Sequence, residues 1–210
     1  MSPIRPFALR ISSLVLASAS LASVAACNSA DPLPIYFDLN YQVGCVLPEC
    51  TAISDGPART VMAVDGENGF QNSCAASTVN GGKLVNLSTS NSGLDIRFEI
   101  TSAVYDSADG NVGSACRVKI VEGSNSYEGR CSAAAPTPAI PCQLTEFRAT
   151  DSGALEGKLY CNDLPVGASP TTTRDIARAG AFDRCTNSSG AEVDPSQCPA
   201  TFLIDPCDGL

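Results

Sequence analysis

Cysteine is the residue type in this sequence whose number and spacing could carry chemistry. The 210-residue chain contains eleven cysteines and no histidine. Zinc and iron–sulfur sites are built from close cysteine pairs such as C-x-x-C, usually with histidine, whereas the tightest pair here is Cys45 and Cys50. The lack of C-x-x-C also argues against thioredoxin-like redox chemistry. We therefore expect no metal site and no cofactor.

Catalytic chemistry is difficult to build from the remaining residue types. Without histidine the commonest general base is missing, and the chain has no G-x-S-x-G elbow, no S-x-x-K pair and no glycine-rich phosphate loop. Its 22 acidic residues leave a two-carboxylate glycosidase open, but no pair stands out. We predict a protein that is not an enzyme, with no catalytic residues.

One polar segment has oxygen ligands of the kind that calcium prefers. In "DSADGN", Asp106, Asp109 and Asn111 gather on a glycine-containing turn. Their spacing does not match an EF-hand loop, and Asp and Asn also bond to their own backbone in ordinary polar turns. The three residues are weak calcium candidates, and a hairpin turn is the favoured interpretation.

The first 26 residues have the pattern of an export signal. Arg5 and Arg10 give a positive start, residues 11–24 are apolar and small, and no acidic residue occurs before Asp31. A run of this length is too short to span a bilayer, which needs about 20 residues. We expect residues 1–26 to be removed as a signal peptide.

The junction Val24-Ala25-Ala26-Cys27 resembles the bacterial lipobox. The resemblance implies a diacylglycerol on the sulfur of Cys27 and cleavage in front of it, which would attach the protein to the lipid bilayer. Asn28 in place of aspartate favours the outer membrane or cell surface. The alternative is ordinary cleavage after Ala26, with Cys27 left free or paired.

Ten cysteines remain if Cys27 carries lipid. In an exported chain an even set of this size predicts five disulfides in an oxidising compartment, and their connectivity stays open. We expect a short tether at 27–34 and one disulfide-stapled domain at 35–210. The predicted disulfide cysteines are Cys45, Cys50, Cys74, Cys116, Cys131, Cys142, Cys161, Cys185, Cys198 and Cys207.

Strand patterns dominate the chain after the tether. Apolar and polar residues alternate in 35–41 and 94–100, as in half-buried antiparallel strands; residues 60–64 and 83–88 are weaker candidates. Turn signals between them have the spacing of a sandwich or barrel. Residues 173–182 could form one or two helical turns. The alternating apolar residues are Ile35, Phe37, Leu39 and Tyr41 in the first strand and Leu94, Ile96, Phe98 and Ile100 in the second.

Two segments each begin and end with cysteine. In "CRVKIVEGSNSYEGRC" (116–131), a Gly123-Ser124 turn of type II′ would put Cys116 opposite Cys131, Ile120 opposite Tyr127 and Val118 opposite Gly129. Most apolar residues of that hairpin then lie on one face.

The second segment, "CQLTEFRATDSGALEGKLYC" (142–161), also fits a hairpin. A loop at 150–153 would put Leu144 opposite Leu159 and Cys142 opposite Cys161, and Phe147 falls out of phase, which suggests a bulge. A disulfide between the neighbouring ends Cys131 and Cys142 remains a competing possibility. The last 26 residues are loop-rich, with only 200–204 strand-like, and we expect disulfides to hold this tail in place of core packing.

These features point to an all-β fold, a disulfide-stapled antiparallel β-sandwich of jelly-roll or immunoglobulin-like type or a partly open barrel. Removing Arg5 and Arg10 from 13 basic residues leaves 11 against 22 acidic residues, a formal net charge of −11, so nucleic acid is an unsuitable partner.

The lipobox together with "LDIRFEI", "CQLTEFRATDSGALEGKLYCNDLP", "GAFDRC" and "ATFLIDPCDG" resembles the uncharacterised cysteine-rich β-sandwich surface lipoproteins of myxobacterial type. The resemblance covers about residues 90–205 and implies a fold and a surface location, without an activity. The expected function is that of a membrane-anchored envelope or surface lipoprotein with a structural, adhesion or binding role and a surface protein or glycan as partner. The alternative is a carbohydrate-binding module or a carboxylate-based glycoside hydrolase on the same scaffold.

Overall fold

The computed structural model describes residues 33–45, 55–80, 82–106, 112–113 and 115–210, and residues 33–210 belong to one compact unit. The described residues form eleven strands, one 3₁₀ turn (Pro195–Gln197) and no α-helix, which confirms the all-β prediction. The strands are β1 (Tyr36–Gly44), β2 (Arg59–Val64), β3 (Phe70–Val79), β4 (Gly82–Asn91), β5 (Ile96–Tyr105), β6 (Cys116–Glu122), β7 (Asn125–Ser132), β8 (Cys142–Ala149), β9 (Leu155–Val166), β10 (Ser169–Ala177) and β11 (Ala200–Asp205).

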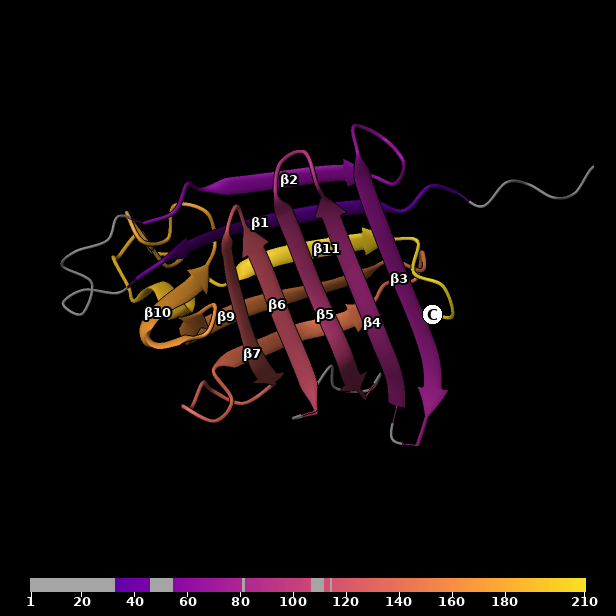
Figure 1. Cartoon of the computed structure of the whole chain (residues 1–210). Helices are drawn as coiled ribbons and strands as arrows, with labels where there is room; N and C mark the ends of the chain where they lie inside the picture. Colours follow the sequence, from indigo (N-terminus) through magenta and orange to yellow (C-terminus); the bar gives the residue numbers. More distant parts are fainter. Residues whose placement is uncertain (1–32, 46–54, 81, 107–111, 114) are drawn as a thin grey trace, which may run out of the picture. The chain divides into compact units, whose positions relative to one another are not determined.

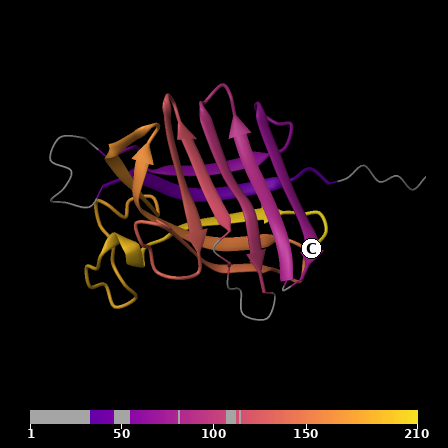
Figure 2. The ribbon, with the colours of Figure 1, turned by 60° about the horizontal axis from the view of Figure 1, so that its bottom comes forward.

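All eleven strands belong to one hydrogen-bonded sheet. Strands β3 to β9 follow one another in sequence order, and β11 and β10 lie end to end between β9 and β1, with β2 on the far side of β1. Figures 1 and 2 show that β3–β7 form one face, which lies over a second face containing β1, β2, β9 and β11. The strands of the two faces run across each other, and their apolar sides enclose the core.

The sheet is mixed, and in this respect the purely antiparallel expectation is wrong. Strands β7 and β8 pair in parallel at Cys131 with Cys142 and at Ser132 with Gln143, whereas the other strand pairs are antiparallel. The intervening segment crosses from the end of β7 back to the start of β8, so β8 begins beside the end of β7. This step carries the chain from one face of the sheet to the other.

The first cysteine-flanked hairpin has the predicted register. Ile120 pairs with Tyr127, Val118 with Gly129 and Cys116 with Cys131, and the two cysteines form a disulfide with their Cα atoms 4.9 Å apart. The turn glycine, Gly123, has a φ of +57°, which a glycine adopts without steric cost. Directly opposed cysteines can bond here because the strands lie close at this pair.

The second hairpin is also confirmed, with a slightly longer loop at 150–154. Leu144 pairs with Leu159, and Cys142 with Cys161 to form a disulfide, so the alternative bond between Cys131 and Cys142 does not form. The register shifts between Thr145 and Arg148. This bulge turns Phe147 inward, where it is fully buried, as its phase predicted.

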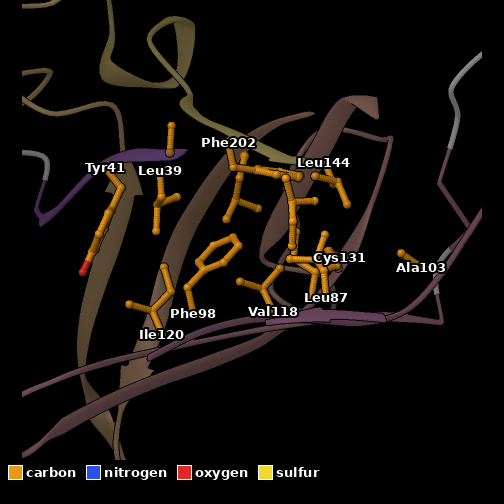
Figure 3. Close-up of a cluster of buried hydrophobic side chains, with 14 of the residues drawn as sticks. Leu39, Tyr41, Leu87, Phe98, Ala103, Val118, Ile120, Cys131, Leu144 and Phe202 are labelled. Carbon is orange, nitrogen blue, oxygen red and sulfur yellow. The ribbon is translucent and has the colours of Figure 1, made fainter. Parts of the chain in front are cut away.

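Five aromatic rings connect the two faces of the sheet in the core. Phe98 of β5 lies 5.7 Å from Phe37 of β1 and 5.8 Å from Phe202 of β11, measured between ring centroids. Figure 3 shows Phe98 and Phe202 within the core. Phe202 continues to Phe147 of β8 at 6.1 Å, and Phe147 meets Tyr105 edge to face at 5.2 Å. Such pairs contribute about 0.5–1.5 kcal/mol each beyond their buried area.

The C-terminal tail therefore packs more deeply than expected. Strand β11 covers the predicted residues 200–204 but lies inside the sheet, between β1 and β9, with Phe202 and Ile204 buried. Gly157 of β9 makes room for Phe202, because a Cβ there would overlap the ring of Phe202 and touch that of Phe147. Two other expectations are wrong. Helical turns were expected at 173–182, but residues 173–177 belong to strand β10. Leu94 was expected to face inward, but it is 57% exposed.

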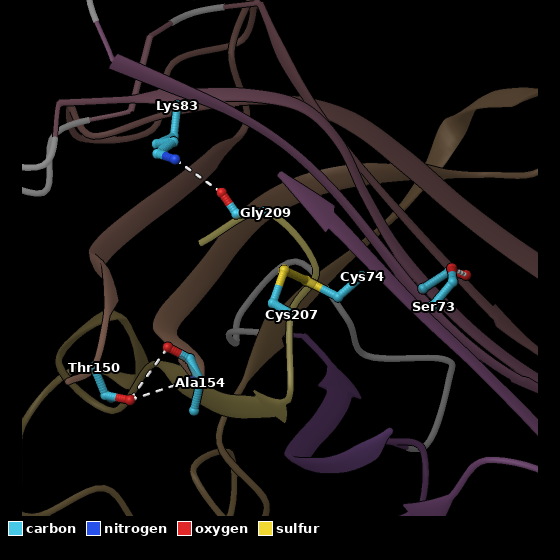
Figure 4. Close-up of a disulfide and its surroundings, with 8 residues drawn as sticks. Ser73, Cys74, Lys83, Thr150, Ala154, Cys207 and Gly209 are labelled. Atoms are coloured by element: carbon cyan, nitrogen blue, oxygen red, sulfur yellow. Dashed lines mark hydrogen bonds between the residues drawn. A yellow bond between two sulfur atoms is a disulfide. The ribbon is translucent and has the colours of Figure 1, made fainter. Parts of the chain in front are cut away.

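The last residues cover the outer edge of β3. Cys207 forms a disulfide with Cys74 of β3, and Lys83 Nζ donates a hydrogen bond to the carbonyl oxygen of Gly209 at 2.8 Å (Figure 4). The Ala76 amide donates to the Asp208 carbonyl oxygen at 2.6 Å. An uncovered edge strand is a template for pairing with other chains, and these contacts occupy part of it. The fourth described disulfide, Cys185–Cys198, lies within the tail.

We predict that the Cys74–Cys207 disulfide stabilises the fold more than Cys116–Cys131 does. The Cys74–Cys207 bond closes a loop of 133 residues, and the Cys116–Cys131 bond closes a loop of 15. Three other disulfides lie within the longer loop and shorten its effective length. The loop-entropy model then gives a difference of about 1–1.5 kcal/mol in the free energy of unfolding. Urea unfolding of the Cys74→Ala/Cys207→Ala and Cys116→Ala/Cys131→Ala proteins measures it, and equal losses would contradict the prediction.

Candidate functional site

A cavity of about 310 Å³ opens where four elements meet. The end of β1, the start of β2, the β6–β7 turn and β10 supply its walls. We call it the arginine cavity because two guanidinium groups line it. Its polar lining residues are Arg59, Glu122, Asn125, Tyr127 and Arg174.

Strand alternation explains why charged residues face the interior here. Residues two apart in a strand point to the same side of a sheet. In β2, Arg59 points to the same inward side as the buried residues Val61 and Ala63. In β6, Glu122 points to the same inward side as Val118 and Ile120. At these strand ends the inward side is partly open to solvent, so the series ends in a charged residue.

Glu122 is the hydrogen-bonding centre of the cavity wall. Its Oε1 atom accepts one hydrogen bond from the hydroxyl of Tyr41 and one from Nε of Arg59, both at 2.7 Å. The Glu122 side chain is 9% exposed and that of Arg59 31%. Tyr41 and Arg59 are direct partners in the β1–β2 register, so both reach Glu122 from one side. Tyr41 is separated from Glu122 by 81 positions in the sequence, and Arg59 by 63 positions.

Tyr127 of the cavity and Tyr41, which bonds to Glu122, are both held in their neutral form. Burial, and next the adjacent Glu122 carboxylate, raise the pKa of Tyr41 far above its usual value of 10.0. Burial and Glu122 also raise the pKa of Tyr127, while Arg174 and a hydrogen bond from Asn125 act in the opposite direction. Figure 3 shows Tyr41 at one end of the core, with its hydroxyl directed away from Phe98 and Phe202.

Arg174 enters the cavity from β10, where it pairs with Leu164 of β9. Its residue surface is 9% exposed. Nη1 donates a hydrogen bond to the carbonyl oxygen of the preceding residue, Thr173, at 2.6 Å. No ion pair joins Arg174 to a carboxylate in the part of the chain that the structure describes. The described residues therefore give the cavity two guanidinium groups and one carboxylate.

The residues singled out in the sequence do not form this site. Eight of the predicted cysteines form four disulfides, and Cys45 is also disulfide-bonded. Asp106 directly follows β5, and within the described residues no three metal-ligating side chains of cysteine, aspartate or glutamate gather. The remaining predicted residues lie outside the described part of the chain: Val24, Ala25, Ala26, Cys27, Cys50, Asp109 and Asn111.

Sequence reasoning missed Arg59, Glu122 and Arg174. For the first two a signal was present, because each stands in an inward-facing position that an apolar residue would normally occupy. Arg174 had no such signal: it lies in the segment interpreted as possible helical turns, where the strand phase was not visible.

Comparison with known proteins returned no match: no family model, no curated protein and no solved structure is significantly similar to the chain. Among the described residues, no helix has the length and apolar character needed to cross a membrane. The four disulfides are consistent with an exported protein.

We predict that stability falls as the pH rises above 10, in part because of Tyr41. Below pH 10 this tyrosine is neutral in both the native and the unfolded chain; above it, the unfolded chain loses the proton and the native protein keeps it. Tyr41→Phe should therefore reduce the loss between pH 10 and 12 by about 2 kcal/mol in total. Urea unfolding at each pH measures this.

Tyr36→Phe is the matched control, because Tyr36 is partly exposed. It should change the pH dependence less than Tyr41→Phe. An identical pH dependence for the unchanged protein and Tyr41→Phe would contradict the role assigned to Tyr41.

Proposed function

We propose that this protein is a lipid-anchored module of the bacterial cell envelope with a non-catalytic binding role. The Val24-Ala25-Ala26-Cys27 junction supports an acylated Cys27 as the attachment to the bilayer. The ten remaining cysteines and the four described disulfides support an oxidising location. Outer membrane or cell surface is the proposed site of attachment.

The observation that supports the binding role is that Glu122 already has hydrogen-bond partners within the protein. It is the one carboxylate among the described residues that line the arginine cavity, and Arg59 and Tyr41 already bond to it. A glycosidase needs two carboxylates, one to donate a proton and one to act as base or nucleophile. A carboxylate held by an arginine and a tyrosine is better suited to shaping a binding site.

A glycan or another small ligand fits this cavity better than a protein surface does. Small-molecule sites are concave and begin at about 300 Å³, and the arginine cavity has about 310 Å³. Nucleic acid is an unsuitable partner because the whole chain carries a formal net charge of −9.

A carboxylate-based hydrolase is the competing function. A panel of glycans incubated with the purified protein separates the two: binding without turnover supports the proposal. Turnover that survives purification and disappears in Glu122→Gln would overturn it, because that substitution removes the charge and keeps the shape of the side chain.

We predict that the intact protein extracted from membranes, with free thiols blocked and without reduction, begins at Cys27 and is heavier by its acyl chains. It should carry no blocked thiol, since the other ten cysteines would all be paired. Mass spectrometry measures both properties. Cys27→Ser is the matched control and should leave the protein without lipid and outside the membrane fraction. An unmodified Cys27, or several blocked thiols, would contradict the anchor.

A further inference from the structure

Arg174 is a largely buried arginine with which no described carboxylate forms an ion pair. Its surface is 9% exposed, and its hydrogen bond goes to the carbonyl oxygen of its own neighbour, Thr173. The next carboxylate along β10, that of Asp175, accepts a hydrogen bond from the amide of Asp163. Removing a charged group from water without pairing it is costly. A ligand that paired with Arg174 would offset this cost.

The charge balance of the cavity defines the charge of that ligand. Among the described lining residues, Arg59 and Arg174 contribute two positive charges and Glu122 one negative charge, so these residues leave one positive charge. A singly charged anion would neutralise it. A doubly charged phosphate ester or sulfate would place its second charge against Glu122, and like charges close together disfavour binding.

The shape of the guanidinium favours a carboxylate. Arginine presents a planar pair of N–H donors that matches the two oxygens of a carboxylate. Tyr127 lines the same cavity as Arg174, and its neutral O–H is a group that can donate a hydrogen bond to a ligand. The cavity thus offers a charged donor pair and a neutral donor. Val43 and Pro57 supply apolar walls.

We propose that the arginine cavity binds a small monocarboxylate with hydroxyl groups, the chemistry of a uronic acid. The ligand carboxylate pairs with Arg174, and a ligand hydroxyl accepts a hydrogen bond from Tyr127. Glu122 and Arg59 remain bonded to each other as part of the cavity lining. The volume of about 310 Å³ suits one sugar ring. This inference rests on the proposed binding role and is independent of the lipid anchor.

Calorimetric titration of the purified full-length protein with D-glucuronate tests the assignment. We expect saturable binding, at least tenfold weaker for the methyl ester of glucuronic acid, for D-glucose and for inorganic phosphate. The ester and glucose have a similar ring without the charge, and phosphate has a charge without the planar carboxylate. Equal affinity for any of the three, or no binding of glucuronate, would overturn the proposal.

Arg174→Gln should weaken glucuronate binding at least tenfold. The matched control is Arg148→Gln, the same substitution at an arginine whose side chain is 64% exposed and paired with Glu156, and it should change the affinity less than twofold. An unchanged affinity in Arg174→Gln would also overturn the proposal. If that variant fails to fold, Tyr127→Phe, expected to weaken binding severalfold, and the ester comparison on the unchanged protein decide the question.

The two proposals can fail separately. Lipid on Cys27 in a protein that does not bind glucuronate would remove the ligand assignment and leave the anchored module. Glucuronate binding by a protein without lipid would remove the anchor and leave the cavity as a carboxylate site.

Discussion

The contact between Phe98 and Phe202 is the interaction on which the two-faced arrangement depends. The rings belong to β5 and β11, on opposite faces of the sheet, and their centroids are 5.8 Å apart. A single sheet has one apolar side that must be covered, and this sheet covers it by folding over itself. Gly157 permits the close approach of Phe202 to β9. Because glycine has no side chain, the large ring of Phe202 on the neighbouring strand fits against it.

The arginine cavity is a consequence of the same closure. Arg59 and Glu122 stand at the ends of inward-facing series on two strands, Tyr41 lies near the end of such a series on a third, and folding the sheet brings them together. Away from the centre of the core, the interior is polar enough to hold the ion pair between Arg59 and Glu122. The Glu122 carboxylate also accepts a hydrogen bond from the hydroxyl of Tyr41. Arg174 arrives from β10 and adds the charge that the ion pair does not neutralise.

Local features of the fold could be predicted because they depend on neighbouring residues. The register of both cysteine-flanked hairpins follows from the turn residues and from the requirement that apolar side chains share a face. The bulge at Phe147 was visible as a break in alternation. The connection between Cys74 and Cys207 was not predictable, because ten cysteines allow many pairings and this one joins positions 133 residues apart.

The amino-acid sequence by itself determined the all-β class, several of the strands, the register of the two cysteine-flanked hairpins and the expectation of export, because alternation, turn chemistry and cysteine content act over short distances along the chain. Tertiary structure alone decided that β11 lies inside the sheet, that β7 and β8 pair in parallel, and that Arg59, Glu122 and Arg174 line one cavity. The physical reason is that these arrangements are set by which apolar surfaces cover one another. Coverage of that kind is a property of the closed core, and no single segment specifies which other segment it will face.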